Sequence, residues 1–359
     1  MENLQGFFKN KKILITGHTG FKGAWLAQIL LNWGSYVSGI ALKPATNPNL
    51  FDLLGQKKRI NNYFVDIRDF AKVKEIIQKE KPEIVFHLAA QPIVRDSYDD
   101  PLYTLETNIM GTVNVLQAIK ETNTVRAAVM ITTDKVYENK ESGRPFKEND
   151  KLGGYDPYSA SKAAAEIVID SYVKSFFNPA DYNKKHKTLI VSARAGNVIG
   201  GGDWQKDRLV PDIVRSVFKR KKIIIRSPDA VRPWQHVLEP LYGYILLAEK
   251  LYRSKKEFSG AWNFGPLNKN YLTVEELIKK ALELLGQGSY GVKRDHGKHE
   301  ARLLKLDSSK AKNLLGWQPK LGMGTVLEMT FNWYKAFNDK KNIIDLTDRQ
   351  INSFLKLWR

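Results

Sequence analysis

The sequence of 359 residues contains no cysteine. Without thiols the chain can form neither disulfides nor thiolate metal sites, which fits a reducing cytoplasm. It has no uninterrupted apolar run near the roughly 18 residues of a membrane-spanning helix, and its first residues, MENLQGFFKNKK, lack the basic-then-apolar order of a signal peptide. We therefore expect a cytoplasmic protein that does not enter membranes, and we expect no metal site because no tight cluster of His and carboxylate side chains is visible.

Acidic residues are few relative to basic ones. The chain has 38 Asp and Glu against 57 Lys and Arg, which gives a formal net charge of +19. A basic surface attracts anions, so nucleic acids, anionic membranes and phosphorylated small molecules are candidate partners. The excess is spread along the chain, and its densest run, KRKK at 219–222, accompanies no recognised nucleic-acid motif. We interpret that run as a solvated helix end and expect no nucleic-acid partner.

Short apolar runs alternate with longer helical patterns in the first half of the chain. Strands are expected at 12–16, 36–41, 63–65, 83–89, 127–133 and 188–193, and helices at 23–33, 70–79, 102–120 and 157–177. Several of these strands are apolar throughout, which is typical of strands covered on both faces. The alternation predicts an α/β fold with a Rossmann-type, doubly wound parallel sheet.

The order of elements loosens after about residue 200. A helix at 208–219, strands at 222–226 and 261–265, a helix at 238–251 and a helix opened by a Thr273/Glu276 capping box indicate a smaller C-terminal lobe. We expect residues 1–195 to bind a dinucleotide and residues 196–359 to form the substrate-binding lobe, with an approximate boundary because the lobes interleave. Ligands should bind at the carboxyl ends of the strands, beneath that lobe.

The segment TGHTGFKG places Gly17, Gly20 and Gly23 between an expected strand and an expected helix. Glycines let the backbone turn sharply and approach a diphosphate, and the helix that follows offers unpaired N–H groups. An ordinary tight connection is the alternative, but the flanking strand and helix favour a dinucleotide site. The Gly-x-x-Gly-x-x-Gly spacing is similar to that of the short-chain dehydrogenase/reductase superfamily.

Tyr158 and Lys162 in YDPYSASK lie one helical turn apart on the same face. Tyr252 and Lys256 share this spacing, so only the position of the first pair, after the fifth strand, indicates catalysis. A tyrosine that acts as a base needs its pKa lowered from about 10 to about 7, which takes on the order of 4 kcal/mol. Lys162 and the positive ring of a nicotinamide can supply this stabilisation; the alternative is a solvated helix face.

With these motifs the chain resembles extended short-chain dehydrogenases of the nucleotide-sugar 4,6-dehydratase group from about residue 11 to residue 333. The segments that carry the resemblance are TGHTGFKGAWL, HLAAQPIVRDSYDDP, TTDKVYEN, DPYSASK, RAGNVIGGGDW, RLVPD and RPWQHVLEPL. The resemblance implies that NAD takes a hydride from C4 of a glucose ring while Tyr158, aided by Thr133, removes the hydroxyl proton. Water then leaves across C5 and C6, and the hydride returns to C6, so the cofactor is regenerated. It also implies a CDP-linked sugar and a role in deoxysugar and surface-polysaccharide synthesis.

Asp134 and Lys135 match the positions that perform the elimination. Related dehydratases carry Asp-Glu there, with the aspartic acid protonating O6 and the glutamate taking the C5 proton. Lys135 would have to be neutral to act as a base. Alternatively it stays charged and stabilises the enolate while Tyr158 or a water takes the proton, or it forms an ion pair with a neighbour such as Glu138.

The residues predict that a dinucleotide cofactor binds, but they say less about whether it is NAD or NADP. Many NAD-specific folds carry Asp or Glu after the second strand, whereas this chain has Lys43 near that position, which would tolerate the 2′-phosphate of NADP. The resemblance favours NAD. His18 and Lys22 are larger and more polar than the residues usual in this turn, so they either loosen the fit of the cofactor or face solvent. The remaining cofactor positions that the resemblance implies are Phe21, Asp66, Ile67, Ala89 and Ala90.

On the substrate side the resemblance implies Asn197, Arg208 and Arg232 around the diphosphate, since guanidinium groups pair with phosphate oxygens. Trp204 and Trp234 belong either to the core or to the sugar site.

Two other functions compete with the dehydratase. A nucleotide-sugar 4-epimerase would not need Asp134 and Lys135, and a non-catalytic dinucleotide sensor or nucleic-acid-binding scaffold would not need Tyr158. Relatives dimerise through the helices expected at 102–120 and 157–177, so we expect a homodimer or a higher homo-oligomer.

Overall fold

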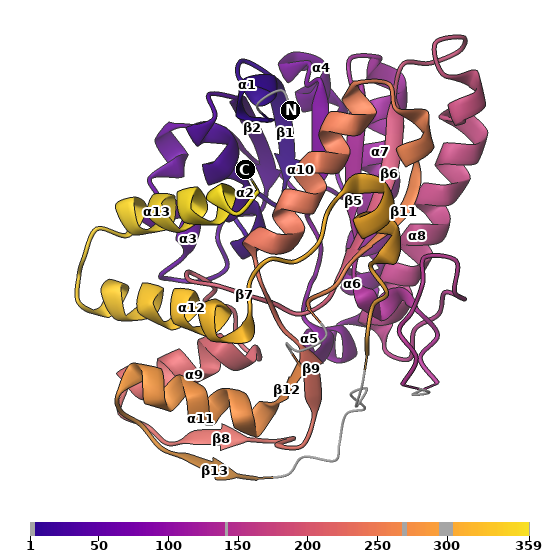
Figure 1. Cartoon of the computed structure of the whole chain (residues 1–359). Helices are drawn as coiled ribbons and strands as arrows, with labels where there is room; N and C mark the ends of the chain where they lie inside the picture. The colour runs from indigo at the N-terminus through magenta and orange to yellow at the C-terminus, as the bar shows by residue number, and fades with distance from the viewer. Residues whose placement is uncertain (1–3, 141–142, 268–270, 294–303, 359) are drawn as a thin grey trace.

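The computed structural model describes residues 4–140, 143–267, 271–293 and 304–358. Its centre is a seven-stranded sheet in the order β11-β6-β5-β4-β1-β2-β3, in which every neighbouring pair is parallel (Figure 1). The strands are β1 (Lys12–Thr16), β2 (Tyr36–Ala41), β3 (Asn61–Phe64), β4 (Ile84–His87), β5 (Ala127–Ile131), β6 (Leu189–Ala195) and β11 (Gly260–Phe264). The predicted Rossmann-type fold is confirmed.

Helices cover both faces of this sheet, because successive side chains of each strand point to opposite sides. Ile13 and Ile15 of β1 belong to a core shared with α2 (Phe21–Asn32) and α10 (Leu238–Tyr252). Leu14 belongs to the core on the other face. That face is covered by α4 (Phe70–Glu80), α7 (Gly111–Thr122) and α8 (Pro157–Phe176).

The short helices of the first half are α1 (Leu4–Phe8), α3 (Leu50–Leu53), α5 (Val94–Asp99) and α6 (Pro101–Leu105). The helix expected over 102–120 is in fact α6 and α7 joined by a π-helical turn at Glu106–Met110. This turn widens the helix next to α8.

Two elements expected in the C-terminal lobe belong instead to the central layers, so that part of the sequence prediction is wrong. Strand β11 pairs in parallel with β6, and its Trp262 and Phe264 are fully buried. Helix α10 packs on β5 and β6.

The C-terminal lobe consists of short sheets and helices at the carboxyl ends of the strands (Figure 1). Its elements are β7 (Val198–Ile199), α9 (Leu209–Phe218), β8 (Ile223–Ile225), β9 (Val231–Pro233), β10 (Gln235–His236), β12 (Tyr271–Thr273), α11 (Val274–Leu285) and β13 (Tyr290–Val292). The Thr273/Glu276 capping box that begins α11 is present as predicted. Helices α12 (Met323–Asn338) and α13 (Ile343–Lys356) follow, and α13 packs against α2.

The chain returns to the central sheet at β11, after residue 195. The division into a dinucleotide-binding part, 1–195, and a substrate-binding lobe, 196–359, stays a prediction. Among the described residues, no helix combines the length and apolar character needed to cross a membrane.

Candidate active site

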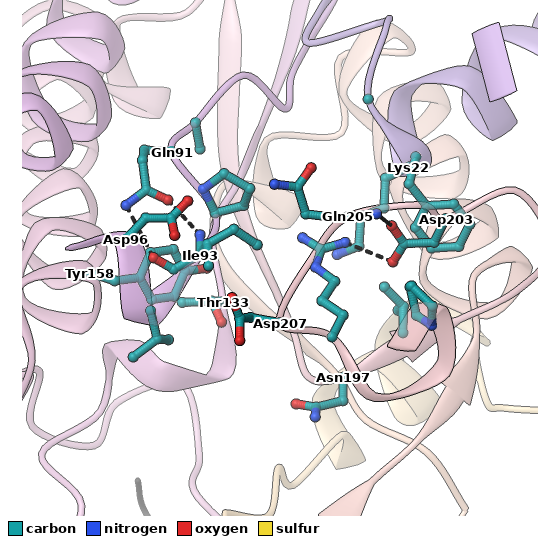
Figure 2. A pocket seen from close by; sticks show the side chains of 18 of the residues that line it. Lys22, Gln91, Ile93, Asp96, Thr133, Tyr158, Asn197, Asp203, Gln205 and Asp207 are labelled. Carbon is teal, nitrogen blue, oxygen red and sulfur yellow. Dashed lines mark hydrogen bonds and ion pairs between the residues drawn. The ribbon is translucent and has the colours of Figure 1, made fainter. Parts of the chain in front are cut away.

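A cavity of about 1550 Å³ lies at the carboxyl ends of the central strands, between the sheet and the C-terminal lobe. Figure 2 shows Tyr158 and Thr133 on one side of this cavity and Lys22 and Asp203 on the other. A cavity of this volume exceeds the usual size of a single small-molecule site, so it has room for two ligands side by side.

The glycine turn forms one end of the cavity. A Cβ atom on Gly17, whose φ is +76°, would lie 2.7 Å from the Ala89 nitrogen, and one on Gly23 would lie 2.1 Å from the Gly17 oxygen. Only glycine therefore permits the turn to pack this closely on the ends of β1 and β4 and on the first turn of α2. Gly20 precedes α2, so unpaired N–H groups of the helix begin at the cavity wall and suit a diphosphate.

His18 and Lys22 of this turn point in different directions. The His18 side chain is fully buried and packs against Gly39, since a Cβ atom on Gly39 would lie 2.3 Å from the His18 ring. The Nε2 atom of His18 forms a hydrogen bond with Asn62 Oδ1 at 2.9 Å. Burial lowers the pKa of His18 to about 4. Neither expected alternative describes this side chain, because it lies away from solvent and away from the cavity.

Lys22 does line the cavity (Figure 2). Burial lowers the pKa of Lys22 to about 8; the charges of Arg208 and Lys162 lower it further, and the charge of Asp134 opposes them. Lys22 is half-buried and faces the cavity, where it places a cation next to the glycine turn.

The remaining expected cofactor residues also line the cavity: Asp66 and Ile67, expected near the adenine, and Ala89 and Ala90, expected at a strand end packed against the dinucleotide. Lys43 after β2 lines it as well. Asp66 accepts a hydrogen bond from Arg68 Nη2 at 2.9 Å. Burial raises the pKa of Asp66, but the hydrogen bonds and charge of Arg68 outweigh it and keep the carboxyl ionised at low pH. An ionised carboxylate at this position can accept hydrogen bonds from an adenosine.

Tyr158 is buried in the first turn of α8, which Asp156 caps by accepting a hydrogen bond from the Ser159 nitrogen at 2.8 Å. Burial raises the pKa of Tyr158 to about 12 against a hydrogen bond with Thr133, which lowers it. Lys162 Nζ donates to the Ile131 oxygen at 3.2 Å, and Arg208 is a positive charge that lowers the pKa of Tyr158. The stabilisation of the phenolate by Lys162 stays a prediction. Burial also lowers the pKa of Lys162 to about 8.

Asp134 and Lys135 follow directly at the end of β5, and both line the cavity. Asp134 is buried and accepts a hydrogen bond from Thr133 Oγ1 at 3.0 Å. Burial raises the pKa of Asp134 above its usual value, although the charge of Lys135 opposes the rise. Glu138, given above as an example of an ion-pair partner for Lys135, pairs with Lys151 at 3.2 Å and with Lys140 at 3.9 Å.

Asn197, Arg208 and Arg232 line the part of the cavity that faces the C-terminal lobe. Arg208 Nη1 donates to Asp203 Oδ2 at 2.9 Å immediately before α9, so a guanidinium group and a helix N-terminus meet there. Trp204 and Trp234 touch the cavity but are buried, and Trp204 packs edge-on against Tyr334. Both tryptophans are mainly core residues.

Sequence reasoning missed a polar connection beneath Tyr158. Asn108, in the π-helical turn, donates to the Gln91 oxygen at 3.1 Å and to Ser161 Oγ at 2.8 Å, and Ser161 in turn donates to the Tyr158 carbonyl at 2.7 Å. These bonds join the segment after β4 to the first turn of α8. A lone asparagine inside a helical pattern gives no sequence signal of such a role.

Comparisons with known proteins agree with this arrangement. The family model described as GDP-mannose 4,6 dehydratase matches residues 14–330. The chain is 46% identical over 352 residues to a CDP-glucose 4,6-dehydratase of Salmonella typhimurium, covering 98% of both chains. It is 26% identical to a UDP-glucuronate 4-epimerase of Thermodesulfobacterium geofontis over 90% of this chain and 95% of the epimerase.

Among solved structures, a UDP-glucose 4-epimerase of Thermotoga maritima superposes with a TM-score of 0.77 at 22% identity, over 91% of this chain and 99% of the epimerase. A dTDP-glucose 4,6-dehydratase of Bacillus anthracis in complex with NAD superposes with a TM-score of 0.75 at 21% identity, over 93% and 99% of the two chains. At these identities the similarity establishes the shared fold.

Proposed function

The chain belongs to the family of the GDP-mannose 4,6 dehydratases, and from this membership we propose that it converts CDP-glucose to CDP-4-dehydro-6-deoxyglucose and water. The observation that carries the substrate is the full-length similarity to the CDP-glucose 4,6-dehydratase of Salmonella typhimurium. The retained Thr133, Asp134 and Tyr158 at one cavity wall support the reaction. A 4-epimerase has no use for an acid at position 134 whose pKa burial raises.

We propose NAD as the cofactor of this reaction, and the residues at the glycine turn and at Asp66 suit its diphosphate and its adenosine. The glycine turn offers the close approach that a diphosphate needs, and Asp66 offers an ionised carboxylate at the adenosine end. When bound, NAD supplies a hydride acceptor and donor and a positively charged ring. Lys162 is the side chain that we assign to the nicotinamide end.

We assign the first proton transfer to Tyr158, which accepts the proton of the C4 hydroxyl, and the orientation of that hydroxyl to Thr133. We assign the elimination to Asp134 and Lys135. Asp134 donates a proton to O6 so that the C6 hydroxyl leaves as water, and burial, which raises the pKa of Asp134, favours the protonated form that this step needs. Lys135 acts on the C5 side of that step: in its neutral form it takes the C5 proton, or as a cation it stabilises the enolate while a water takes that proton.

A direct assay tests the function. The protein is incubated with NAD+ and, separately, with CDP-, dTDP-, UDP- and GDP-linked sugars, and the 4-keto-6-deoxy product is detected by its absorbance in alkali. We expect turnover of CDP-glucose well above that of the other sugars. A 4-epimer as product would instead establish an epimerase, and no turnover of any sugar would establish a non-catalytic scaffold.

Arg208→Gln should raise KM for CDP-glucose by roughly 10- to 100-fold, with a smaller effect on kcat. A charge-assisted hydrogen bond from a guanidinium group to a phosphate contributes about 1.5–3 kcal/mol, and we assign this one to the substrate diphosphate. Lys219→Gln, at the exposed end of the same helix, removes one positive charge far from the cavity and is the control. Equal KM values for the two variants would contradict the assignment.

We also propose a homodimer, formed through α6, α7 and α8. Leu102 of α6, Met110 at the end of the π-helical turn before α7, and Ile167 of α8 are at least half exposed, at 66%, 50% and 60%. Large apolar side chains exposed together mark association surfaces, and a second copy would cover the same patch on its partner.

Ile167→Glu is expected to convert the dimer to a monomer in sedimentation or light-scattering measurements, because it places a charge in the middle of an apolar contact. Ile224→Glu is the matched control, since Ile224 of β8 is similarly exposed, at 56%, but lies in the C-terminal lobe. A dimer that survives Ile167→Glu, or a wild-type monomer, would rule out this interface.

A further inference from the structure

A buried ion pair joins α8 to β6 behind the wall of the cavity. Glu166 and Arg194 have side chains that are 3% and 4% exposed. Arg194 binds the carboxylate with two hydrogen bonds, from Nε to Oε1 at 2.9 Å and from Nη2 to Oε2 at 2.8 Å. This is the two-pronged geometry in which a guanidinium group fixes a carboxylate most firmly.

The carboxylate side of this pair is tied to the active-site segment. Glu166 also accepts hydrogen bonds from the Thr132 hydroxyl and from Ser192 Oγ, the latter at 2.7 Å. Thr132 immediately precedes Thr133, Asp134 and Lys135. Glu166 lies one helical turn beyond Lys162 and two turns beyond Tyr158, so a single helix face carries all three side chains.

The guanidinium side is tied to the other end of the same segment. Arg194 Nη1 donates to the Tyr137 hydroxyl at 2.8 Å, and that hydroxyl donates to Asn263 Oδ1 at 2.7 Å. Tyr137 directly follows the 3-10 turn Asp134–Val136. The ion pair therefore holds the segment at both ends, through Thr132 before it and Tyr137 after it.

Stability alone does not account for such a pair. Withdrawing two charges from water costs several kcal/mol per ion, and apolar residues of the same volume are often as stabilising or more so. Four donors satisfy this carboxylate, however, and a fully satisfied buried network restricts the chain to one arrangement. The charge of Glu166 also favours the ammonium form of Lys162 against burial.

We propose that Glu166 and Arg194 are positioning residues, which fix the Thr133–Lys135 segment relative to Tyr158 and Lys162 for the reaction proposed above. Tyr158 and Lys162 reach the cavity from α8, whereas Thr133, Asp134 and Lys135 reach it from the end of β5. The oxidation uses Tyr158 and Lys162 of α8 together with Thr133, and the elimination uses Asp134 and Lys135. One bound substrate can therefore undergo both steps only if α8 and the segment after β5 keep a fixed position relative to each other.

The test removes the links and leaves the ion pair intact, because deleting either charge strands the other in the interior. Thr132→Val removes the link before the segment, and Tyr137→Phe removes the link after it. Thr188→Val and Tyr182→Phe are matched controls: both residues are buried, Thr188 donates to the Val125 oxygen at 2.6 Å, and the Tyr182 hydroxyl bonds with Ser254 at 2.7 Å, all away from the cavity.

Thr132→Val and Tyr137→Phe should each lower kcat about tenfold relative to their controls with KM within about threefold, since small displacements of reacting groups slow chemistry more than binding. Because the displaced segment carries both groups of the elimination, Asp134 and Lys135, reduced cofactor should accumulate during turnover. Hydrogen exchange of the ligand-free protein should show faster exchange at the amides of residues 133–136 in both variants but in neither control.

Different results would refute the proposed function and the positioning role of Glu166 and Arg194. A wild-type protein that does not act on CDP-glucose would refute the proposed function, while the exchange measurement, which needs no substrate, would still decide the positioning role. Exchange at 133–136 equal to that of the controls, or kcat within twofold of theirs, would refute the positioning role and leave the proposed function intact.

Discussion

Replacement of Tyr158 by phenylalanine is expected to lower kcat for CDP-glucose by about 1000-fold, which is a typical effect of removing a general acid or base. The variant keeps the buried ring and loses only the hydroxyl, so the C4 hydroxyl proton has no acceptor and the first oxidation stops. Binding of NAD+, measured by calorimetry, should change by less than about threefold because the phenol makes a small part of the contact area.

Tyr172→Phe provides the control for this prediction. Tyr172 lies on the same helix, and its hydroxyl donates to Gln117 Oε1 at 3.1 Å, away from the cavity. The same chemical change there should leave kcat near that of the wild type. Near-normal turnover by Tyr158→Phe would remove this tyrosine from the mechanism, and a matching loss of NAD+ binding would indicate a disturbed site instead of lost chemistry.

The sequence predicted those parts of the fold that local signals determine. The strands from β1 to β6 lie within a few residues of their expected places, because each is a short apolar run between turns. The start of α8, and with it the place of Tyr158, follows from a capping Asp156 and a proline at the first helical position. The strand at β11 was expected, but its place in the C-terminal lobe was not correct. Its pairing with β6 joins residues far apart in the chain, and no local pattern encodes such a pairing.

In the candidate active site, too, local sequence signals predicted one part and contacts between distant residues determined the rest. Its members could be predicted from motifs, but the directions of their side chains could not, because these depend on space left by other elements. His18 fits only beneath Gly39, Ile67 packs where a Cβ on Gly111 would lie 2.4 Å from its Cδ1, and Asp134 lies where a Cβ on Gly196 would be 2.9 Å from its Oδ2. Such complementarity between distant residues is visible only in the folded chain.

The orientation of Lys162 could not be predicted for a related reason. Its ammonium group donates to the Ile131 carbonyl at the end of β5, an acceptor that no sequence pattern identifies. Burial raises the pKa of Tyr158 to about 12 in the protein without a cofactor. The positively charged ring of a bound nicotinamide would add stabilisation of the phenolate.

Asp134→Asn is expected to lower kcat by about 100- to 1000-fold, but for a different reason from Tyr158→Phe. An amide cannot donate the proton that O6 needs to leave as water, whereas the oxidation at C4 does not use this carboxyl. The first step should therefore proceed and the elimination should stall, so that absorbance of the reduced nicotinamide accumulates after CDP-glucose is mixed with the NAD+-loaded protein. Tyr158→Phe should show no such accumulation.

The pH dependence gives a second and independent signature of Asp134. Because burial raises its pKa, the protonated form that donates to O6 persists above the usual range of a carboxyl group, and kcat of the wild type should fall as the pH rises through the raised value. The Asn variant has no proton to lose there, so this fall should disappear from its profile. Asp150→Asn, at a carboxyl that pairs with Arg144 outside the cavity, should keep both the wild-type rate and its profile. Loss of activity without accumulation of reduced cofactor, and with the wild-type pH profile, would mean that Asp134 acts before the elimination, and the proton for O6 would then have to come from Lys135.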